Sequence, residues 1–272
     1  MDKKSKNIQL QYQGYLNTPL LWKNDNILEL KQLEITKLNP SSFEDTHGKP
    51  MLLGKRVERF VIKELQEYKD IKIRIENVQI QNDKITIGEL DCILMKNKVP
   101  IHLEIIYKFY LHDSRIGNTE LDHWIGPNRK DDLLKKLHKL RDKQLPLLHN
   151  EHTKPILKAL ELNSTKIEQR VLFKAQLFIP YNAVVPDFKL LNKEAIKGFY
   201  IPFIEIEQFS ECKFYIPIKM DWLLEVQTQV EWLSYSQFHE KITPLISNKT
   251  APLCWIKFPN GVLQKFFVTW WV

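Results

Sequence analysis

Acidic and basic side chains recur in two apolar segments near the middle of the chain. Asp91 lies in the segment 84–96, and Glu104 and Lys108 lie in the segment 99–110. Both segments are rich in Ile, Leu, Val, Tyr and Phe, and a short polar turn separates them, so we predict two antiparallel strands that form a hairpin. Two carboxylates and a lysine gathered on a sheet could hold a divalent metal ion and stabilise negative charge in a reaction.

The turn between the two strands sets which side chains face each other. A tight turn pairs Lys96 with Val99. Counting back from that pair places Asp91 directly opposite Glu104, with β-carbons about 5 Å apart. Two carboxylates at that distance repel each other, so we expect a cation beside them, either a divalent metal or a lysine. The alternative is an exposed polar face with harmless charges, and a three-residue loop would shift the register and undo the pairing.

Strand alternation divides the hairpin into two faces. The polar face carries Glu89, Asp91, Ile93, His102, Glu104, Ile106 and Lys108. The other face is apolar and is expected to form core; it carries Leu90, Cys92, Leu94, Ile101, Leu103, Ile105 and Tyr107. Because Val, Ile, Phe and Tyr surround the charges, we expect both strands to be central in their sheet.

The pattern Gly88-Glu89-Leu90-Asp91, followed on the next strand by Glu104 and Lys108, resembles the PD-(D/E)XK superfamily of restriction-endonuclease-like nucleases. From about residue 50 onward, the chain also resembles the bacterial family called domain of unknown function 1853. The landmarks that carry this second resemblance are His102, Phe109-Tyr110-Leu111, Gly126-Pro127-Asn128, Gln144-Leu145 and Asp221-Trp222-Leu223. One departure is Ile106, which occupies the usual position of the superfamily lysine, with Lys108 two residues later on the same face. Either the lysine has moved to position 108, or the activity is altered or lost.

The resemblance implies an α/β (α+β) fold with a restriction-endonuclease-like core, in which helices flank a central mixed β-sheet, and a β-rich C-terminal extension. We therefore divide the chain into an N-terminal helical segment with a linker (1–50), the core (51–182) and a mixed α/β extension packed on the core (183–272). The predicted core elements are a helix over 51–68, a strand over 71–81, the hairpin, a helix over 126–148 and a strand over 170–181.

The first helix of this core offers a third acid. Its apolar stripe at helical spacing consists of Leu53, Val57, Phe60, Val61, Leu65 and Tyr68. Periodicity alone favours Glu64 as the acid that faces inward. The resemblance instead implies that Glu58, in Leu53-Gly54-x-x-x-Glu58, faces the site, and a solvated helix flank is the alternative for Glu58.

The second core helix carries a glutamine among leucines. Its predicted buried stripe is Leu133, Leu137, Leu140, Gln144 and Leu148. An unpaired buried amide costs roughly 1–3 kcal/mol, so Gln144 is expected to have a specific partner, either a backbone group or the metal site. Lysines cover the other sides of this helix, and most form a solvated face. Lys136 matches a lysine of the related family and is the preferred phosphate contact.

Outside the core the pattern is less specific. We expect a loose basic tail over 1–8, one or two helices over 9–38 with a break near 24–26, and a linker over 39–50. The C-terminal part is predicted to contain strands near 198–205, 212–219, 252–258 and 262–270, and a helix near 235–246. Five tryptophans cluster there and are interpreted as core residues, with base stacking as the alternative; they are Trp222, Trp232, Trp255, Trp270 and Trp271.

Composition limits the classes of protein to consider. The chain has 272 residues, of which 43% are hydrophobic and 11% aromatic, which excludes a disordered chain. The net charge of +7 is compatible with a polyanionic partner. The three cysteines form no CxxC pair, which argues against a cysteine zinc site and favours a reducing, cytoplasmic compartment. We expect neither a signal peptide nor a membrane span, because no apolar run follows the charged start and none approaches about 18 residues.

These observations lead to three functional hypotheses. The first, implied by the resemblance, is a nuclease that uses Mg²⁺ (or Mn²⁺) held by Asp91 and Glu104. In this hypothesis the Ile105 carbonyl is a further ligand, Glu58 assists the metal, and Lys108 stabilises the transition state. The expected partner is nucleic acid, with DNA preferred. The second is a catalytically inactive nuclease-like protein that binds nucleic acid or acts as a scaffold. The third is a glycosidase that uses the two opposed acids, which leaves the lysine unexplained.

Overall fold

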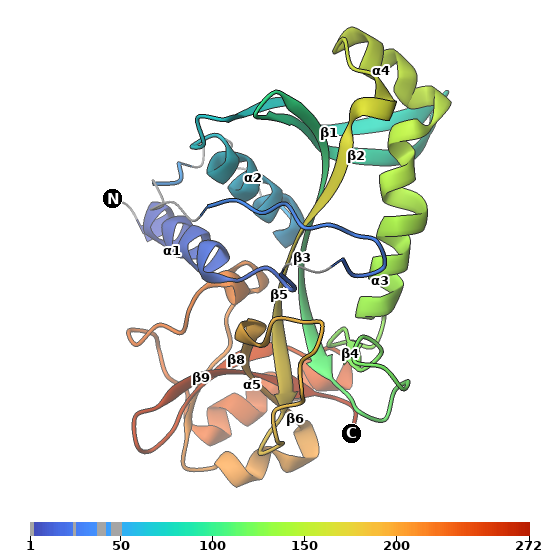
Figure 1. The fold of residues 1–272 in the computed structure, drawn as a ribbon. Coiled ribbons are helices and arrows are strands. Elements are labelled where there is room, and N and C mark those ends of the chain that lie inside the picture. Colours follow the sequence, from blue (N-terminus) through green and yellow to red (C-terminus); the bar gives the residue numbers. More distant parts are fainter. Residues whose placement is uncertain (1–2, 24–25, 37–41, 45–50) are drawn as a thin grey trace. The chain divides into compact units, whose positions relative to one another are not determined.

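A computed structural model describes residues 3–23, 26–36, 42–44 and 51–272 of the chain. The fold is mixed α/β, with a large mixed β-sheet flanked by helices (Figure 1). The chain divides into two compact units. The hairpin unit comprises Leu20–Tyr107 and Lys135–Lys174, and the terminal unit comprises Met1–Pro19, Lys108–Leu134 and Ala175–Val272. The division into 1–50, 51–182 and 183–272 stays a prediction.

The hairpin unit is built on the strand order β1-β2-β3-β5. Its strands are β1 (Ile71–Asn82), β2 (Ile85–Lys96) and the first parts of β3 (Val99–His112) and β5 (Glu168–Pro180). Its helices are α2 (Leu53–Leu65), the end of α3 (Leu133–Lys139), the π-helix η1 (Leu140–Gln144), the 3₁₀ helices η2 (Leu145–His149), η3 (Glu151–Thr153) and η4 (Ser164–Lys166), and α4 (Lys154–Ala159). Helix α2 buries the predicted stripe, so that Val57, Phe60, Val61 and Leu65 are all almost fully enclosed.

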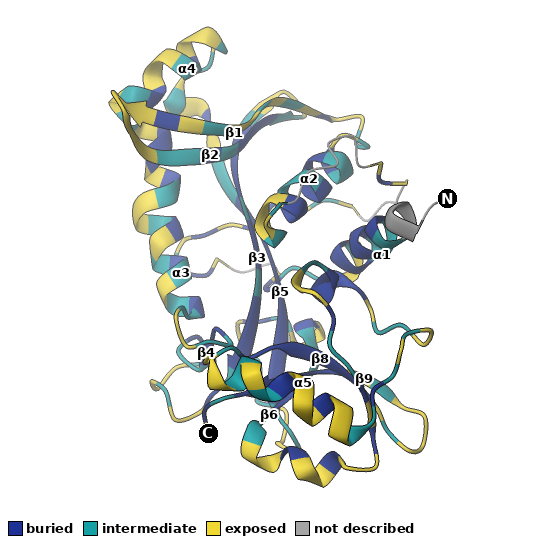
Figure 2. Ribbon diagram, turned by 180° about the vertical axis from the view of Figure 1, so that it is seen from behind, coloured by how far each residue is buried: buried dark blue, intermediate teal, exposed yellow. Residues whose placement is uncertain are grey.

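The predicted register of the hairpin is confirmed where the ladder between β2 and β3 is regular. Lys96 pairs with Val99, and the pairing continues to Cys92 opposite Leu103. Strand β3 lies between β2 and β5 and is therefore central, as expected from its apolar surroundings. Figure 2 shows β3 and β5 as buried over most of their lengths. The polar face is therefore partly enclosed, since His102 and Glu104 are both 0% exposed.

The terminal unit continues the sheet in the order β3-β5-β6-β9-β8-β7, with β4 paired to β3. Its further elements are α1 (Lys3–Asn17), β4 (Trp124–Ile125), η5 (Lys193–Ala195), β6 (Ile196–Pro202), η6 (Phe203–Phe209), β7 (Lys213–Tyr215), η7 (Lys219–Leu223), α5 (Tyr235–Ser247), β8 (Leu253–Lys257) and β9 (Leu263–Thr269). The four predicted C-terminal strands and the helix are thus present. Helix α5 begins at a capping box, in which Ser234 and Gln237 each bond the other's backbone N–H.

The N-terminal predictions need correction. Helix α1 already begins at Lys3, so residues 3–8 are helical and not a loose tail. No second helix follows in the described part of 18–36, because this segment runs beside β5 instead. The N–H groups of Leu21 and Leu33 donate to the Phe173 and Val171 carbonyls, and the Gln32 amide bonds both backbone groups of Phe173. Residues 24–25 and most of the predicted 39–50 linker lie outside the described residues.

The predicted 126–148 helix also starts later than expected. Helical structure begins at Leu133, and the stretch to residue 149 changes from α to π to 3₁₀ geometry. The predicted leucines of its stripe are nevertheless buried. Among the described residues, no helix is long and apolar enough to cross a membrane. The cytoplasmic location stays a prediction.

Candidate functional site

Four carboxylates of the hairpin unit gather around the start of the β2–β3 ladder. Asp91 and Glu89 come from β2, Glu104 from β3 and Glu58 from α2. Counted from the turn, the last regular pair of the ladder is Cys92–Leu103. At the next position, the Ile105 N–H donates to Asp91 Oδ2 at 2.8 Å. The two strands of the hairpin and a helix that precedes them by about 20 residues in the chain therefore bring acids to one place.

The pKa of Asp91 reflects the negative charges that surround it. Burial, followed by repulsion from Glu104, raises the pKa of Asp91 to about 7. The N–H of Ile105 opposes this by bonding the carboxylate, Glu58 raises the pKa further and Lys55 lowers it. Near neutral pH the Asp91 carboxylate is thus held in a place that disfavours its charge, which is a site suited to an added cation.

Lys55 is a cation beside these acids that was not among the predicted site residues. Its Nζ lies 2.8 Å from Glu58 Oε2, 2.5 Å from Glu89 Oε1 and 3.0 Å from Asn77 Oδ1. Burial raises the pKa of Glu58, Lys55 opposes that rise, and Glu89 and Glu104 add to it. Burial lowers the pKa of Lys55, but its bonds to Glu58 and Glu89 outweigh this and raise it overall. Its place one helical turn before Glu58 is a signal that the sequence offered.

Lys108 forms an ion pair with an acid of its own unit. It belongs to the terminal unit, where its Nζ lies 2.6 Å from Asp131 Oδ2. Ile106, at the usual position of the superfamily lysine, is buried in the hairpin unit. Of the predicted site residues, Asp91, Glu104 and Glu58 are brought together within the hairpin unit. The predicted role of Lys108 beside these acids stays a prediction.

Gln144 and Lys136 do reach the acids of the hairpin unit. Gln144 Nε2 donates to Glu104 Oε2 at 2.5 Å, and Lys136 Nζ donates to Gln144 Oε1 at 2.7 Å. On the other oxygen, Glu104 Oε1 lies 3.2 Å from His102 Nε2, and His102 Nδ1 lies 3.3 Å from Gln169 Nε2. Strand alternation places His102 on the same face as Glu104 but gives it no role, and no sequence pattern points to Gln169.

The donor chemistry of this site fits a hard divalent cation. Asp91 and Glu104 supply oxygen atoms only, and Mg²⁺ characteristically uses one or two carboxylates and takes its other ligands from water and substrate phosphates. Within the described residues, no three His, Cys, Asp or Glu side chains are arranged as a complete protein cage for a metal. Carboxylate oxygens of this kind suit Mg²⁺ or Mn²⁺ better than a structural zinc ion, which is held by cysteine and histidine.

Two of the sequence landmarks have structural partners in the terminal unit. Asp221, which is buried, accepts hydrogen bonds from Asn7 and Gln11 of α1 at 2.9 and 2.8 Å. Asn128 Oδ1 accepts the Ala251 N–H at 2.8 Å. The Pro127 carbonyl accepts the Trp271 indole N–H at 2.9 Å. These contacts explain both landmarks by packing and hydrogen bonding alone.

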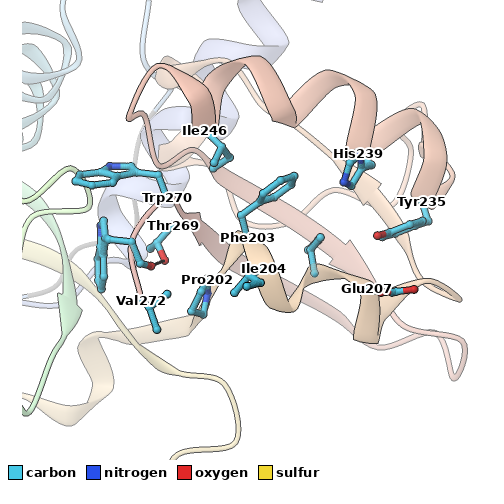
Figure 3. A pocket seen from close by; sticks show the side chains of 12 residues that line it. Pro202, Phe203, Ile204, Glu207, Tyr235, His239, Ile246, Thr269, Trp270 and Val272 are labelled. Carbon is cyan, nitrogen blue, oxygen red and sulfur yellow. Dashed lines mark hydrogen bonds between the residues drawn. The ribbon is translucent and has the colours of Figure 1, made fainter.

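The tryptophans of the terminal unit are mainly core residues. Trp222, Trp255 and Trp271 are buried, as the core interpretation expects. Trp270 instead lines a pocket of about 520 Å³ beside η6 and α5 (Figure 3). The side chains of Phe203 and His239 also line this pocket. Its walls are mostly apolar and aromatic, and Glu207 is the acid that lines it.

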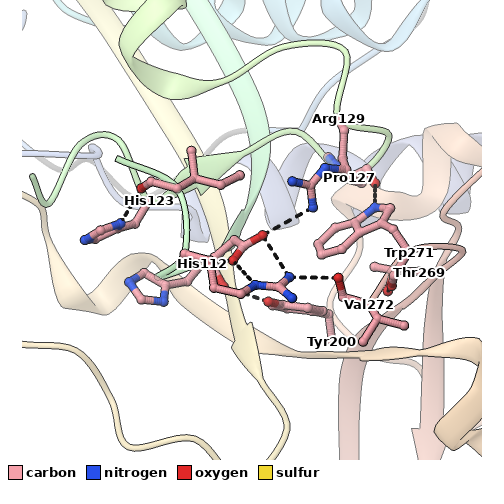
Figure 4. A network of polar contacts seen from close by, with 11 residues as sticks. His112, His123, Pro127, Arg129, Tyr200, Thr269, Trp271 and Val272 are labelled. Atoms are coloured by element: carbon pink, nitrogen blue, oxygen red, sulfur yellow. Dashed lines mark hydrogen bonds and ion pairs between the residues drawn. The ribbon is translucent and has the colours of Figure 1, made fainter. Parts of the chain in front are cut away.

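In the terminal unit, a network of hydrogen bonds around a buried acid connects the loop after β3 with the last described residue, Val272 (Figure 4). Asp113, which is 3% exposed, accepts hydrogen bonds from Arg115 Nε at 2.8 Å and Arg129 Nη1 at 3.2 Å. Arg115 also donates to the Val272 carbonyl at 2.8 Å. Burial acts to raise the pKa of Asp113, but the Arg115 and Arg129 guanidinium groups outweigh it and hold this pKa below its usual range.

Asp113→Ala is expected to lower the free energy of unfolding by about 2–3 kcal/mol, because charged hydrogen bonds are lost and two guanidinium groups keep no shared counter-charge. The pKa of Asp113 is depressed, so its stabilising effect is present above the unfolded pKa near 4 and is lost as the pH falls through the lower, folded value. Urea denaturation at pH 7 and pH 3 measures both effects. The exposed Asp187→Ala is the matched control, and equal stability of the two variants at pH 7 would contradict the assignment.

Comparison with known proteins gives a family but no characterised relative. No curated protein and no protein of solved structure matched the chain. The sequence model of one family matches residues 10–265, which is most of the chain. The landmarks at residues 88–91, 102–111 and 221–223 all lie within this match. The chain therefore belongs to the family described as "Domain of unknown function (DUF1853)".

Proposed function

We propose that the protein is a Mg²⁺-dependent nuclease that hydrolyses phosphodiester bonds of nucleic acid. The observation that carries this proposal is that Asp91 and Glu104 lie close together on neighbouring strands, with Glu58 beside them. Burial and the charges of Glu104 and Glu58 raise the pKa of Asp91. The net charge of +7 is compatible with a polyanionic substrate.

The order of elements in the chain supports a restriction-endonuclease-like core, which is part of the same proposal. Helix α2 is followed by β1, β2 and β3, then by the helical stretch from α3, and then by β5. This is the order of helix, three strands, helix and strand that the resemblance to the PD-(D/E)XK superfamily implies. In that resemblance the acids on the second and third strands hold the metal, and Asp91 and Glu104 occupy those strands.

In this proposal Asp91 and Glu104 hold the metal and Glu58 supports it. When bound, Mg²⁺ or Mn²⁺ supplies a water of lowered pKa and neutralises charge on the leaving oxygen. Lys55, held by Glu58 and Glu89, keeps a positive charge next to the acids and stabilises the added charge of a phosphodiester. Lys136 is the proposed phosphate contact, because its ammonium group lies one amide away from Glu104.

Metal removal tests the proposal directly. Purified protein is incubated with single- and double-stranded DNA and RNA after chelation, and then with Mg²⁺ or Mn²⁺ added back. We expect cleavage of at least one substrate with either metal and none after chelation. Isothermal calorimetry of both metals, with and without an uncleavable duplex, accompanies the assay. Absence of both metal binding and cleavage on every substrate would contradict the nuclease.

A second candidate is a nuclease-like protein that binds nucleic acid without cleaving it. Two observations favour it: Ile106 is buried at the usual position of the catalytic lysine, and Lys108 is paired with Asp131. This candidate expects binding that weakens steeply with salt and no turnover with any metal. The assay above, repeated at two salt concentrations, separates the two functions.

A further inference from the structure

We infer that His102, Gln144, Gln169 and Lys136 act as positioning residues that hold the Glu104 carboxylate in one orientation. The inference deepens the proposed function, since Glu104 is one of the two proposed metal ligands. Glu104 and His102 are both fully enclosed, so no solvent competes for their hydrogen bonds. Each oxygen of Glu104 has its own protein partner, one from η1 and one from β3 itself.

The direction of the Gln144 amide is fixed by Lys136. A lysine ammonium group donates hydrogen bonds and cannot accept one, so the amide atom 2.7 Å from Lys136 Nζ must be the Gln144 oxygen. The amide nitrogen then faces Glu104 Oε2, 2.5 Å away, and donates to it. Lys136 therefore acts on Glu104 through Gln144.

The tautomer of His102 is fixed in the same way by Gln169. Gln169 Nε2 lies 2.6 Å from the Leu145 carbonyl, which can only accept, so this end of the amide is the NH₂ group. Its second hydrogen points to His102 Nδ1 at 3.3 Å, which makes Nδ1 the acceptor. The ring proton is then on Nε2, which donates to Glu104 Oε1 at 3.2 Å.

The π-helical turn explains how one helical stretch can supply these contacts. Residues 140–144 form η1, and Gln144 is its last residue. Such π-turns are rare and widen the helix locally, so they change which side chains face a neighbouring strand. The carbonyl of the next residue, Leu145, accepts the Gln169 amide, so the last residue of η1 and the first residue of η2 serve the two sides of the network.

The consequence for function is a carboxylate that is already oriented before metal or substrate arrives. Groups that orient a metal ligand in this way typically change metal affinity or activity 10–100-fold when they are removed. We therefore expect His102→Leu to weaken Mn²⁺ affinity about 10–100-fold. His102→Gln keeps a side-chain N–H donor of similar size, and it is expected to recover most of that loss.

A tautomer measurement tests the network independently of any metal. Long-range ¹H–¹⁵N correlation spectra of the ¹⁵N-histidine-labelled chain distinguish Nε2–H from Nδ1–H rings, and the His102→Gln variant identifies the His102 signals. We expect the Nε2–H form in the wild type, and exchange between both tautomers in Gln169→Leu, in which the fixing donor is gone. An Nδ1–H ring, or two exchanging tautomers in the wild type, would overturn the inference.

Mn²⁺ calorimetry of the two His102 variants completes the test, with the exposed His149→Leu of the same unit as the matched control. Thermal unfolding of each variant first establishes that it is folded; if His102→Leu is not, Gln144→Leu replaces it. Equal affinities of His102→Leu, His102→Gln and wild type would overturn the inference. If the wild type binds no metal even with an uncleavable duplex, the nuclease proposal fails, and the tautomer measurement alone decides whether the network holds Glu104.

Discussion

Asp91→Asn is expected to reduce Mg²⁺-dependent cleavage more than about 100-fold. Groups that merely orient metal ligands cost 10–100-fold when removed, so loss of a charged ligand should exceed that range. The substitution is the mildest one that the site offers. Asparagine keeps an oxygen that can accept the Ile105 N–H, which Asp91 Oδ2 accepts at 2.8 Å, and so the local backbone contact is preserved.

Single-turnover cleavage at several Mg²⁺ concentrations measures this effect. The matched control is Glu76→Gln, which removes one negative charge from an exposed position of the neighbouring strand β1, opposite Cys92. We expect the control to cleave like the wild type and Asp91→Asn to stay inactive at every metal concentration. Cleavage by Asp91→Asn within about threefold of the control would show that Asp91 is not a metal ligand.

The hairpin that carries the two acids could be predicted from sequence because its information is local. A short polar turn between two β-branched segments sets the register, and the observed pair Lys96–Val99 agrees with it. Alternation then gives the faces without any knowledge of the rest of the chain. What alternation could not give is burial, because an acid on a central strand looks the same in sequence as an acid on a solvated one.

The rest of the site depends on contacts between distant elements. Lys55 and Glu58 lie on a helix with a strong apolar stripe. The stripe predicts which face of the helix is buried, but it does not predict which polar residues beside that face contact an acid on a strand. Gln169 reaches His102 from β5, 67 residues later in the chain. The π-turn that ends at Gln144 has no simple sequence signature, and the regular helical spacing of the leucines does not reveal it.

The segment after α1 shows how tertiary contacts override a local pattern. Mixed spacing of Leu, Trp and Ile suggested helix, yet Leu20, Leu21, Gln32 and Leu33 pair with the backbone of β5. Gln32 is the residue that reveals why, since its amide replaces a backbone partner by pairing with both the N–H and the carbonyl of Phe173. Such a side-chain contribution to a sheet edge is specified by the neighbour and not by the segment itself.

The same Asp91→Asn variant is expected to be more stable than the wild type at pH 8 in the absence of metal. An aspartate in the unfolded chain titrates near 3.9, whereas the folded Asp91 titrates at about 7. Between these values the native state holds a proton that the unfolded chain releases, so stability falls as the pH rises from about 4 to 7. Above pH 7 the full penalty remains, on the order of 4 kcal/mol, and asparagine avoids it.

Thermal unfolding at pH 5 and pH 8 measures this gain, which should be roughly 5–15 °C at pH 8 and smaller at pH 5 for a chain of this size. Added Mg²⁺ should then raise the unfolding temperature of the wild type and leave Asp91→Asn unchanged, because only the wild type has the charge that binds the ion. A variant that is less stable than the wild type at pH 8 would contradict the crowding of charge at Asp91. A gain in stability together with a loss of cleavage would instead mean that the Asp91 carboxylate lowers the free energy of unfolding and is retained because it binds the metal ion.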